Sequence, residues 1–264
     1  AEPQKFTVDA SKDVTEVTMK NTTNSVVISK KELTGSKSIG GAVLRVVDSL
    51  GNIIIPQWTT EENKDKEKQR NFDIFKYDGL KAMKIGKIGY AVRCFNEALA
   101  IEEEFETLNY LALAYIQQGD VSEAIEAYSR MTLLDSEETD TFLNRAQLYL
   151  QENQAEAAIA DCEYILTKKS TDYRAHFLIG QAYKMLNRPE AAIDSLSKAI
   201  EIKNDMADIF LLRSGLLTEL KQYDQALQDV NTAIRLAPEE ENAYMQRGAI
   251  YEALKDTPSA RQDY

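Results

Sequence analysis

Residues 110–125 read YLALAYIQQGDVSEAI and residues 177–193 read FLIGQAYKMLNRPEAAI, and these two stretches decide the fold. Each contains two segments of apolar residues at helical spacing, separated by a short polar turn. An alanine lies in the second segment of both stretches, at Ala124 and Ala192. The pattern predicts pairs of amphipathic helices joined as hairpins, and it recurs along the chain.

The alanine marks a regular register from residue 72 onward. It recurs at spacings of 33, 34, 34, 34 and 34 residues, at Ala91, Ala124, Ala158, Ala192, Ala226 and Ala260. Small residues stand twelve positions before each alanine, at Gly79, Ala112, Ala146, Gly180, Ser214 and Gly248. Larger residues mostly stand four positions after it, at Phe95, Tyr128, Cys162, Leu196, Val230 and Tyr264. Small residues on facing sides allow the two helices of a hairpin to approach closely.

Five residues before each alanine the sequence favours a tight turn. These positions are Gly86, Gly119, Asn153, Asn187, Lys221 and Lys255, and Gly or Asn is preferred where a helix ends. One such hairpin cannot bury its apolar faces alone, so the copies are expected to stack. The predicted repeats are residues 72–104, 105–138, 139–172, 173–206, 207–240 and 241–264.

This register resembles the tetratricopeptide repeat (TPR), a helix-turn-helix unit of 34 residues. The resemblance covers residues 72–264, about three-quarters of the chain. It implies a mainly α fold, an α-α superhelix of about six repeats, of which the last stops within its second helix. Among the predicted turns, the family's proline stands only at Pro238.

Residues 1–58 follow a different pattern, with short β-branched runs broken by Asp, Asn, Ser, Gly and Lys. The runs are Phe6–Val8, Val14–Met19, Val26–Ile28, Val43–Val47 and Ile53–Ile55. In AVLRVVDSLGNIII, Gly51 and Asn52 tolerate the positive φ of a hairpin turn. We therefore expect a small all-β unit over residues 1–58.

Residues 25–55 also resemble the opening of prealbumin-like repeats from Gram-positive surface proteins, through VVISKKELTGSKSIGGAVLRVVDSLGNII. That resemblance implies a bacterial source and a Lys–Asn isopeptide bond, for which Lys30 is the matching lysine. A generic β-hairpin sandwich is the alternative. Residues 59–71 are highly charged, and Thr59 with Glu62 fits a capping box. We expect a charged helical connector there, continuous with the first repeat.

Composition excludes several classes of protein. The chain of 264 residues carries a formal charge of −12, so a phosphate backbone would be repelled and nucleic acid is not an expected partner. No run approaches the roughly 20 apolar residues of a membrane helix. Two cysteines, Cys94 and Cys162, make neither a metal knuckle nor a disulfide framework. The two cysteines favour the cytoplasm slightly over a periplasmic or cell-surface location. The sequence starts at Ala1 without Met, which leaves open a removed initiator, a cleaved leader or a fragment.

Catalytic chemistry has little material in this sequence. His176 is the only histidine, and with no second ligand at a suitable spacing a packing role is favoured. Glycine-rich phosphate loops and the HExxH and GxSxG patterns are absent from the sequence. We therefore expect a non-enzyme with no cofactor and no metal.

Three hairpins share a charge pattern that predicts internal ion pairs. Arginine at the seventh repeat position is followed sixteen residues later by aspartate, in the pairs Arg145–Asp161, Arg213–Asp229 and Arg247–Asp263. The other three repeats have neither partner. An arginine pointing into a hairpin needs a carboxylate, so a structural role is favoured over an arginine array for an anionic ligand.

The resemblance also implies a concave surface lined by the first helices. At its fifth and ninth repeat positions we expect partner-binding residues, chiefly Lys76, Leu80, Asn109, Leu113, Leu143, Gln147, Phe177, Gln181 and Leu211. The second positions are mostly acidic, at Asp73, Glu106, Asp140 and Asp208, with Arg174 the exception. The Lys, Arg and Asn set with which some family members clamp a chaperone's terminal carboxylate is not reproduced.

These residues predict an interaction scaffold that binds a protein, peptide or helix with apolar anchors and basic residues. Leu113, Leu143, Phe177 and Leu211 are expected to form one continuous apolar stripe along the groove. The alternatives are that the stripe packs only within the protein, or that the chain is a surface-displayed structural or adhesive protein with a β stalk module. The sequence does not indicate the oligomeric state.

Overall fold

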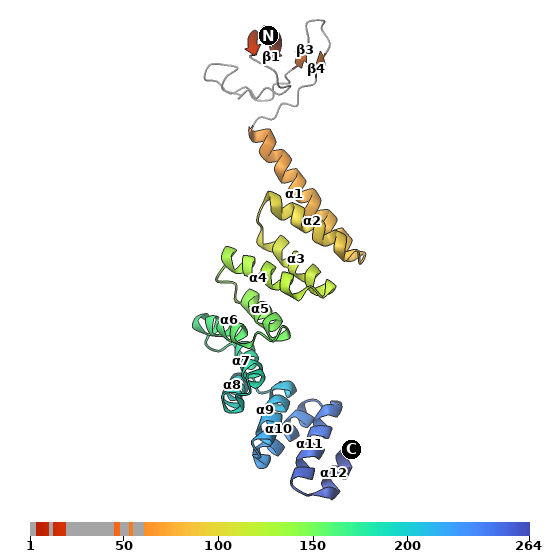
Figure 1. The fold of residues 1–264 in the computed structure, drawn as a ribbon, viewed down its shortest axis with the longest axis vertical. Coiled ribbons are helices and arrows are strands. Elements are labelled where there is room, and N and C mark those ends of the chain that lie inside the picture. Colours follow the sequence, from red (N-terminus) through yellow and green to blue (C-terminus); the bar gives the residue numbers. More distant parts are fainter. Residues whose placement is uncertain (1–3, 11–12, 20–44, 48–52, 55–60) are drawn as a thin grey trace. The chain divides into compact units, whose positions relative to one another are not determined.

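The computed structural model describes residues 4–10, 13–19, 45–47, 53–54 and 61–264 (Figure 1). The chain divides into two compact units, Ala1–Phe75 and Lys76–Tyr264. The division falls inside one helix, α1 (Glu61–Lys84).

The described strands of the first unit form an antiparallel sheet. They are β1 (Gln4–Ala10), β2 (Asp13–Met19), β3 (Arg45–Val47) and β4 (Ile53–Ile54), in the order β2-β1-β3-β4. In the register Phe6 lies opposite Val17 and Val46 opposite Ile54. β3 and β4 fall within the segment AVLRVVDSLGNIII and pair antiparallel. The expected strand Val26–Ile28, the turn at Gly51 and the isopeptide lysine Lys30 lie outside the described residues.

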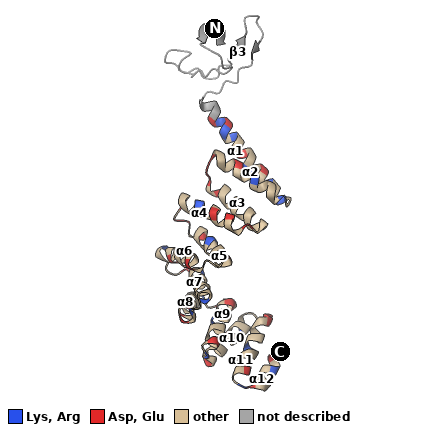
Figure 2. Cartoon of the chain, in the orientation of Figure 1, with Lys and Arg blue, Asp and Glu red and all other residues tan. Residues whose placement is uncertain are grey.

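The charged connector is the first half of α1. Residues 65–71 are exposed, and this part of the helix shows bands of basic and acidic residues (Figure 2). An exposed polar helix of this kind depends on the propensity of Glu, Lys, Gln and Arg for helix. The predicted continuity with the first repeat is present, whereas the proposed cap Thr59 lies outside the described residues.

The second unit is a stack of helical hairpins. Its helices after α1 are α2 (Ile88–Ile101), α3 (Phe105–Gln118), α4 (Val121–Leu134), α5 (Thr139–Gln151), α6 (Ala155–Lys168), α7 (Tyr173–Met185), α8 (Pro189–Ile202), α9 (Ala207–Glu219), α10 (Tyr223–Leu236), α11 (Glu241–Ala253) and α12 (Thr257–Asp263). From α2 onward each helix packs against the next one in sequence. The first helices of neighbouring repeats also touch, α5 with α7 and α9 with α11.

The turns inside the hairpins lie where the register placed them. All six expected positions have positive φ, from 55° at Asn187 to 86° at Gly119. Glycine adopts this region freely and Asn tolerates it, but Lys221 and Lys255 adopt it at a conformational cost. The fold therefore requires a left-handed residue at this position even where the sequence supplies a lysine.

The core of each hairpin is built on the alanine register. The six marker alanines are between 0% and 2% exposed. Where the small residue is glycine, a large side chain fills the space that a Cβ would need. A Cβ on Gly180 would lie 2.7 Å from Leu196, and one on Gly248 would lie 2.9 Å from Tyr264. The close approach of the two helices thus depends on a matched pair of positions.

Candidate functional site

The arginine–aspartate pairs occur in the three hairpins that the sequence indicated. Arg145 donates from Nε and Nη2 to Asp161 at 2.8 and 2.7 Å. Arg213 reaches Asp229 at 2.7 and 2.8 Å in the same two-pronged geometry. The third pair shows it again, at 2.8 and 2.6 Å, between Arg247 and Asp263. Each pair joins the two helices of one hairpin.

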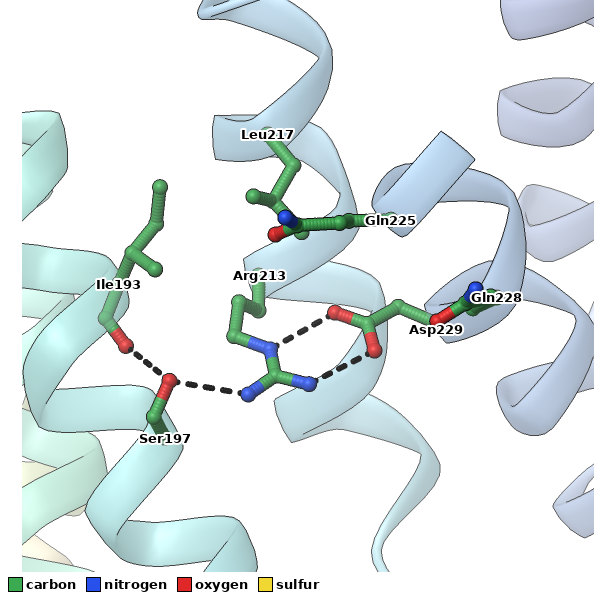
Figure 3. Close-up of a pocket in the computed structure, with 7 residues that line it drawn as sticks. All are labelled: Ile193, Ser197, Arg213, Leu217, Gln225, Gln228 and Asp229. Carbon is green, nitrogen blue, oxygen red and sulfur yellow. Dashed lines mark hydrogen bonds and ion pairs between the residues drawn. The ribbon is translucent and has the colours of Figure 1, made fainter. Parts of the chain in front are cut away.

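Each of these arginines also reaches back to the preceding repeat. Arg213 Nη1 donates to Ser197 Oγ at 2.9 Å, and Ser197 Oγ donates to the carbonyl of Ile193 at 2.7 Å (Figure 3). The equivalent acceptors are Ser129 for Arg145, at 3.0 Å, and Asn231 for Arg247, at 2.8 Å. Their signal in the sequence is a polar residue sixteen positions before the arginine, which our sequence reasoning missed.

We call each arginine, its aspartate and the polar acceptor of the preceding repeat a three-helix clamp, for example Arg213, Asp229 and Ser197. The two charges of a clamp are paired with each other. A cavity of about 420 Å³ beside Arg213 is lined by the ion pair itself together with Ser197, Gln225 and Gln228. Burial opposes the charge of the equivalent Arg145, but the hydrogen bond to Asp161 and the attraction of its negative charge together raise the pKa of the arginine. A pair held in this way fixes the hairpin against its neighbour and leaves no activated nucleophile or base.

The two repeat junctions without a clamp carry ion pairs on the first helices instead. Between the first and second repeats, Lys76 Nζ donates to Glu104 Oε2 at 2.9 Å and also to Glu106. The hydrogen bond from Lys76 lowers the pKa of Glu106, and although burial opposes the lysine's charge, the two carboxylates raise the pKa of Lys76.

Between the third and fourth repeats, Arg174 forms the equivalent ion pairs. It contacts Asp140 of α5 at 2.9 Å and the buried Asp172 at 2.9 Å. Burial opposes ionisation of Asp172, but the side chain and backbone N–H of Arg174, together with the charge of Lys169, lower the carboxyl pKa. Lys76 and Arg174, two cations expected on the concave surface, are therefore engaged within the protein.

The last three repeats form an open groove. It has a volume of about 750 Å³ and lies across three successive first helices, α7, α9 and α11. Its lining residues are Phe177, Gln181, Lys184, Asp208, Leu211, Leu212, Gly215, Glu240, Asn242, Met245 and Gln246. Most of them occupy the second, fifth or ninth repeat positions, where the resemblance implied a concave surface.

The groove combines apolar side chains with exposed charged ones. Met245 is 59% exposed, and Lys184, Asp208 and Glu240 are exposed as well. Within residues 65–264, no ion pair or side-chain hydrogen bond of these three charged residues is found. This end of the concave surface is thus the part whose charges can meet a ligand.

The expected continuous stripe of four apolar residues is wrong. Leu143 and Leu211 are only 6% and 9% exposed and pack in the cores, whereas Leu113 is 42% exposed. Leu143 lies in α5, which contacts α7, and Leu211 lies in α9, which contacts α11. Phe177 is half-buried and Gln181 lines the groove.

The remaining expected groove residues lie apart from this site. Leu80 and Asn109 are half-buried in the first two repeats, and Gln147 is exposed in the third. Sequence reasoning missed five of the lining residues, which are Lys184, Leu212, Glu240, Asn242 and Gln246.

The histidine and the two cysteines, which are the side chains most suited to catalysis or metal binding, are partly or fully buried. Burial lowers the pKa of His176 and raises that of the Cys162 thiol to about 12. Cys94 and Cys162 are both buried free thiols. Across the described part of the chain, His, Cys, Asp and Glu side chains form no group of three that could hold a metal. No helix in that part has the length and apolarity needed to cross a bilayer.

Solved structures with the same architecture are numerous. The structure of MamA has a TM-score of 0.54 and 24% identity, and the match covers 58% of this chain and 90% of that one. A TPR protein from Parabacteroides merdae ATCC 43184 has a TM-score of 0.64 and 20% identity, with coverage of 74% and 77%. YrrB has a TM-score of 0.52 and 16% identity, with coverage of 64% and 88%. At these identities the likeness shows the fold alone.

Models of a known protein family match the sequence of the repeats. Two models of the tetratricopeptide repeat match, one over residues 79–138 and one over residues 173–206 and 207–240. The latter boundaries coincide with the fourth and fifth repeats of the register. No curated protein matches the sequence. The hairpins, their turns and the family match together show that this chain contains tetratricopeptide repeats.

Proposed function

We propose that the protein is a non-enzymatic interaction scaffold that binds a segment of a partner protein in the groove formed by α7, α9 and α11. The observation that carries this proposal is the groove itself, with about 750 Å³ of space and exposed charges unpaired within the described residues. The TPR fold is typical of protein–protein interaction, and YrrB is described as a TPR protein with an unusual peptide-binding site.

The chemistry of the groove indicates the type of segment. Phe177, Leu212 and Met245 provide apolar surface for one or two apolar anchors. Asp208 and Glu240 favour basic residues beside those anchors. Because exposed charges are screened by salt, the affinity is expected to fall as the ionic strength rises.

The test is selection of peptides from a phage-displayed library of random twelve-residue sequences on the full chain. We expect enriched peptides with apolar anchors and a basic residue. Met245→Asp should weaken them by about tenfold to a hundredfold, because burial of a methionine contributes about 1.5–3 kcal/mol. Met245 is 59% exposed, so the fold should be retained.

Leu133→Asp is the matched control, because Leu133 is 87% exposed and lies outside the groove. It introduces the same charge and should leave peptide affinity unchanged. If Met245→Asp binds the selected peptides as well as the unchanged protein does, or if no peptide is enriched, the groove is not the site. Residues 1–58 then become the candidate binding element.

A further inference from the structure

The charges of the groove lie on its two opposite edges. Lys184 is in the last turn of α7, whereas Asp208 is in the first turn of α9 and Glu240 precedes α11. Helices alternate in direction along the stack, so these three first helices run the same way. Lys184 lies ten residues beyond the second repeat position of its helix, which corresponds to about 15 Å along an α-helix. The groove therefore has one acidic edge and one basic edge.

Two other cations of the first helices are paired within the protein. Lys76 and Arg174 are neutralised by carboxylates of the same protein. The junctions within the last three repeats are held by the clamps of Arg213 and Arg247, so concave charges are not needed to join them. Here, then, Lys184, Asp208 and Glu240 remain available to a ligand.

We propose that the groove binds a bipolar segment, in which an acidic residue meets Lys184, a basic residue meets Asp208 and Glu240, and an apolar side chain between them rests on Phe177 and Met245. This inference rests on the proposed function and adds the acidic group and its position. A distance of about 15 Å corresponds to four or five residues of an extended chain. The two opposite charges fix which way the segment lies across the groove.

A purely structural explanation makes a different prediction. Acidic residues at a helix start and a lysine at a helix end complement the helix dipole and stabilise it by a few tenths of a kcal/mol up to about 1 kcal/mol. Under that explanation Lys184→Glu would lower the stability slightly and leave the peptide preference unchanged. The two explanations are separated by the sequences of the selected peptides.

The experiment repeats the random twelve-residue selection on the unchanged chain and on Lys184→Glu. Peptides from the unchanged chain should carry an acidic and a basic residue four or five positions apart, with an apolar residue between them. Peptides from Lys184→Glu should have a basic or neutral residue in place of the acidic one. Lys84→Glu, in the last turn of α1 and outside the groove, is the matched control and should select the original consensus.

A synthetic peptide of that consensus then measures the contact directly. Replacing its acidic residue by Gln should weaken binding to the unchanged chain by about fivefold at low salt, the magnitude of an exposed ion pair. The same replacement should have no effect on Lys184→Glu or should strengthen binding to it.

The outcomes separate this inference from the proposed function. Enriched peptides that carry apolar and basic residues but no preferred acid, with an unchanged consensus on Lys184→Glu, overturn the bipolar segment and leave the groove function intact. Absence of any enriched peptide, or full binding by Met245→Asp, overturns both.

Discussion

At the scale of single residues, the spacing between the two helices of a hairpin is decided by pairs of positions sixteen apart. Gly180 faces Leu196, Gly79 faces Phe95 and Gly248 faces Tyr264. Where the first member is alanine the second need not be large, as with Ala146 and Cys162. At the three glycines the facing side chain leaves no room for a Cβ, as a close-packed interior requires.

Gly180→Ala should therefore destabilise the protein by about 1–3 kcal/mol, the usual effect of overpacking. The added Cβ would lie 2.7 Å from Leu196, which is fully buried and cannot swing into solvent. Urea denaturation followed by circular dichroism measures the change. Gly180→Ala combined with Leu196→Cys reproduces the pair of the third repeat and should regain part of the loss. A single Gly180→Ala variant as stable as the unchanged protein would contradict this account.

Sequence periodicity predicted these positions because each has one structural task. A left-handed turn residue or a buried alanine is recognisable wherever it recurs. The exposure of leucines on the concave surface was not predictable in the same way. Leu143 is at the fifth repeat position and is buried, whereas Leu113 is at the ninth and is exposed. Contact between neighbouring first helices covers the fifth position of α5 more than the ninth position of α3. Such contact depends on the stacking of whole repeats.

At the scale of helices, the three clamps hold second helices to the hairpins that follow them. Arg213 joins α8, α9 and α10 through Ser197 and Asp229. The aspartate was predictable because arginine and aspartate occur together in three repeats and are both missing from the other three. The serine was not recognised, because an exposed-looking polar residue on a second helix has many possible roles.

Asp229→Ala should lower the free energy of unfolding by about 3 kcal/mol, because Arg213 is left with a charge that the protein interior does not compensate. Ser197→Ala, which removes a single hydrogen bond, should lower it by about 1 kcal/mol. Both values come from urea denaturation. Replacing Arg213 by Met in the Asp229→Ala background should restore part of the stability. Equal and small effects of the two single variants would show that the clamp contributes little.

At the scale of the whole solenoid, ion pairs on carboxylates join its repeats. Hydrogen bonds from Arg130 and Lys76 lower the pKa of Glu103 and Glu106, and Arg174 lowers that of Asp172. A carboxyl with a lowered folded-state pKa stabilises the protein fully above its unfolded-state value. That contribution is lost as the pH falls through the folded-state pKa.

The thermal stability of the protein should therefore fall as the pH is lowered from about 5 to 2. Asp172→Asn keeps a side chain that can cap α7 but cannot ionise. At pH 7 the variant should be less stable by about 1–3 kcal/mol, the contribution of a hydrogen bond to a charged group. The difference should shrink as the pH is lowered from 7 toward about 2, because Asp172 of the unchanged protein loses its charge as the pH falls through its lowered folded-state pKa. A difference that is the same at both pH values would assign the effect to packing.

The back-reaching hydrogen bond of each clamp has a consequence for how this chain can be cut and recombined. A 34-residue exchange at the boundaries of residues 207–240 transfers Arg213 and Asp229 but leaves Ser197 in the donor. The smallest portable cassette is therefore three helices, beginning at α8 rather than at α9. A duplicated or grafted segment that begins at α8 keeps the hydrogen bond between Arg213 and Ser197. In a graft of the hairpin alone, the second hydrogen bond of Arg213 depends on the residue that the recipient supplies.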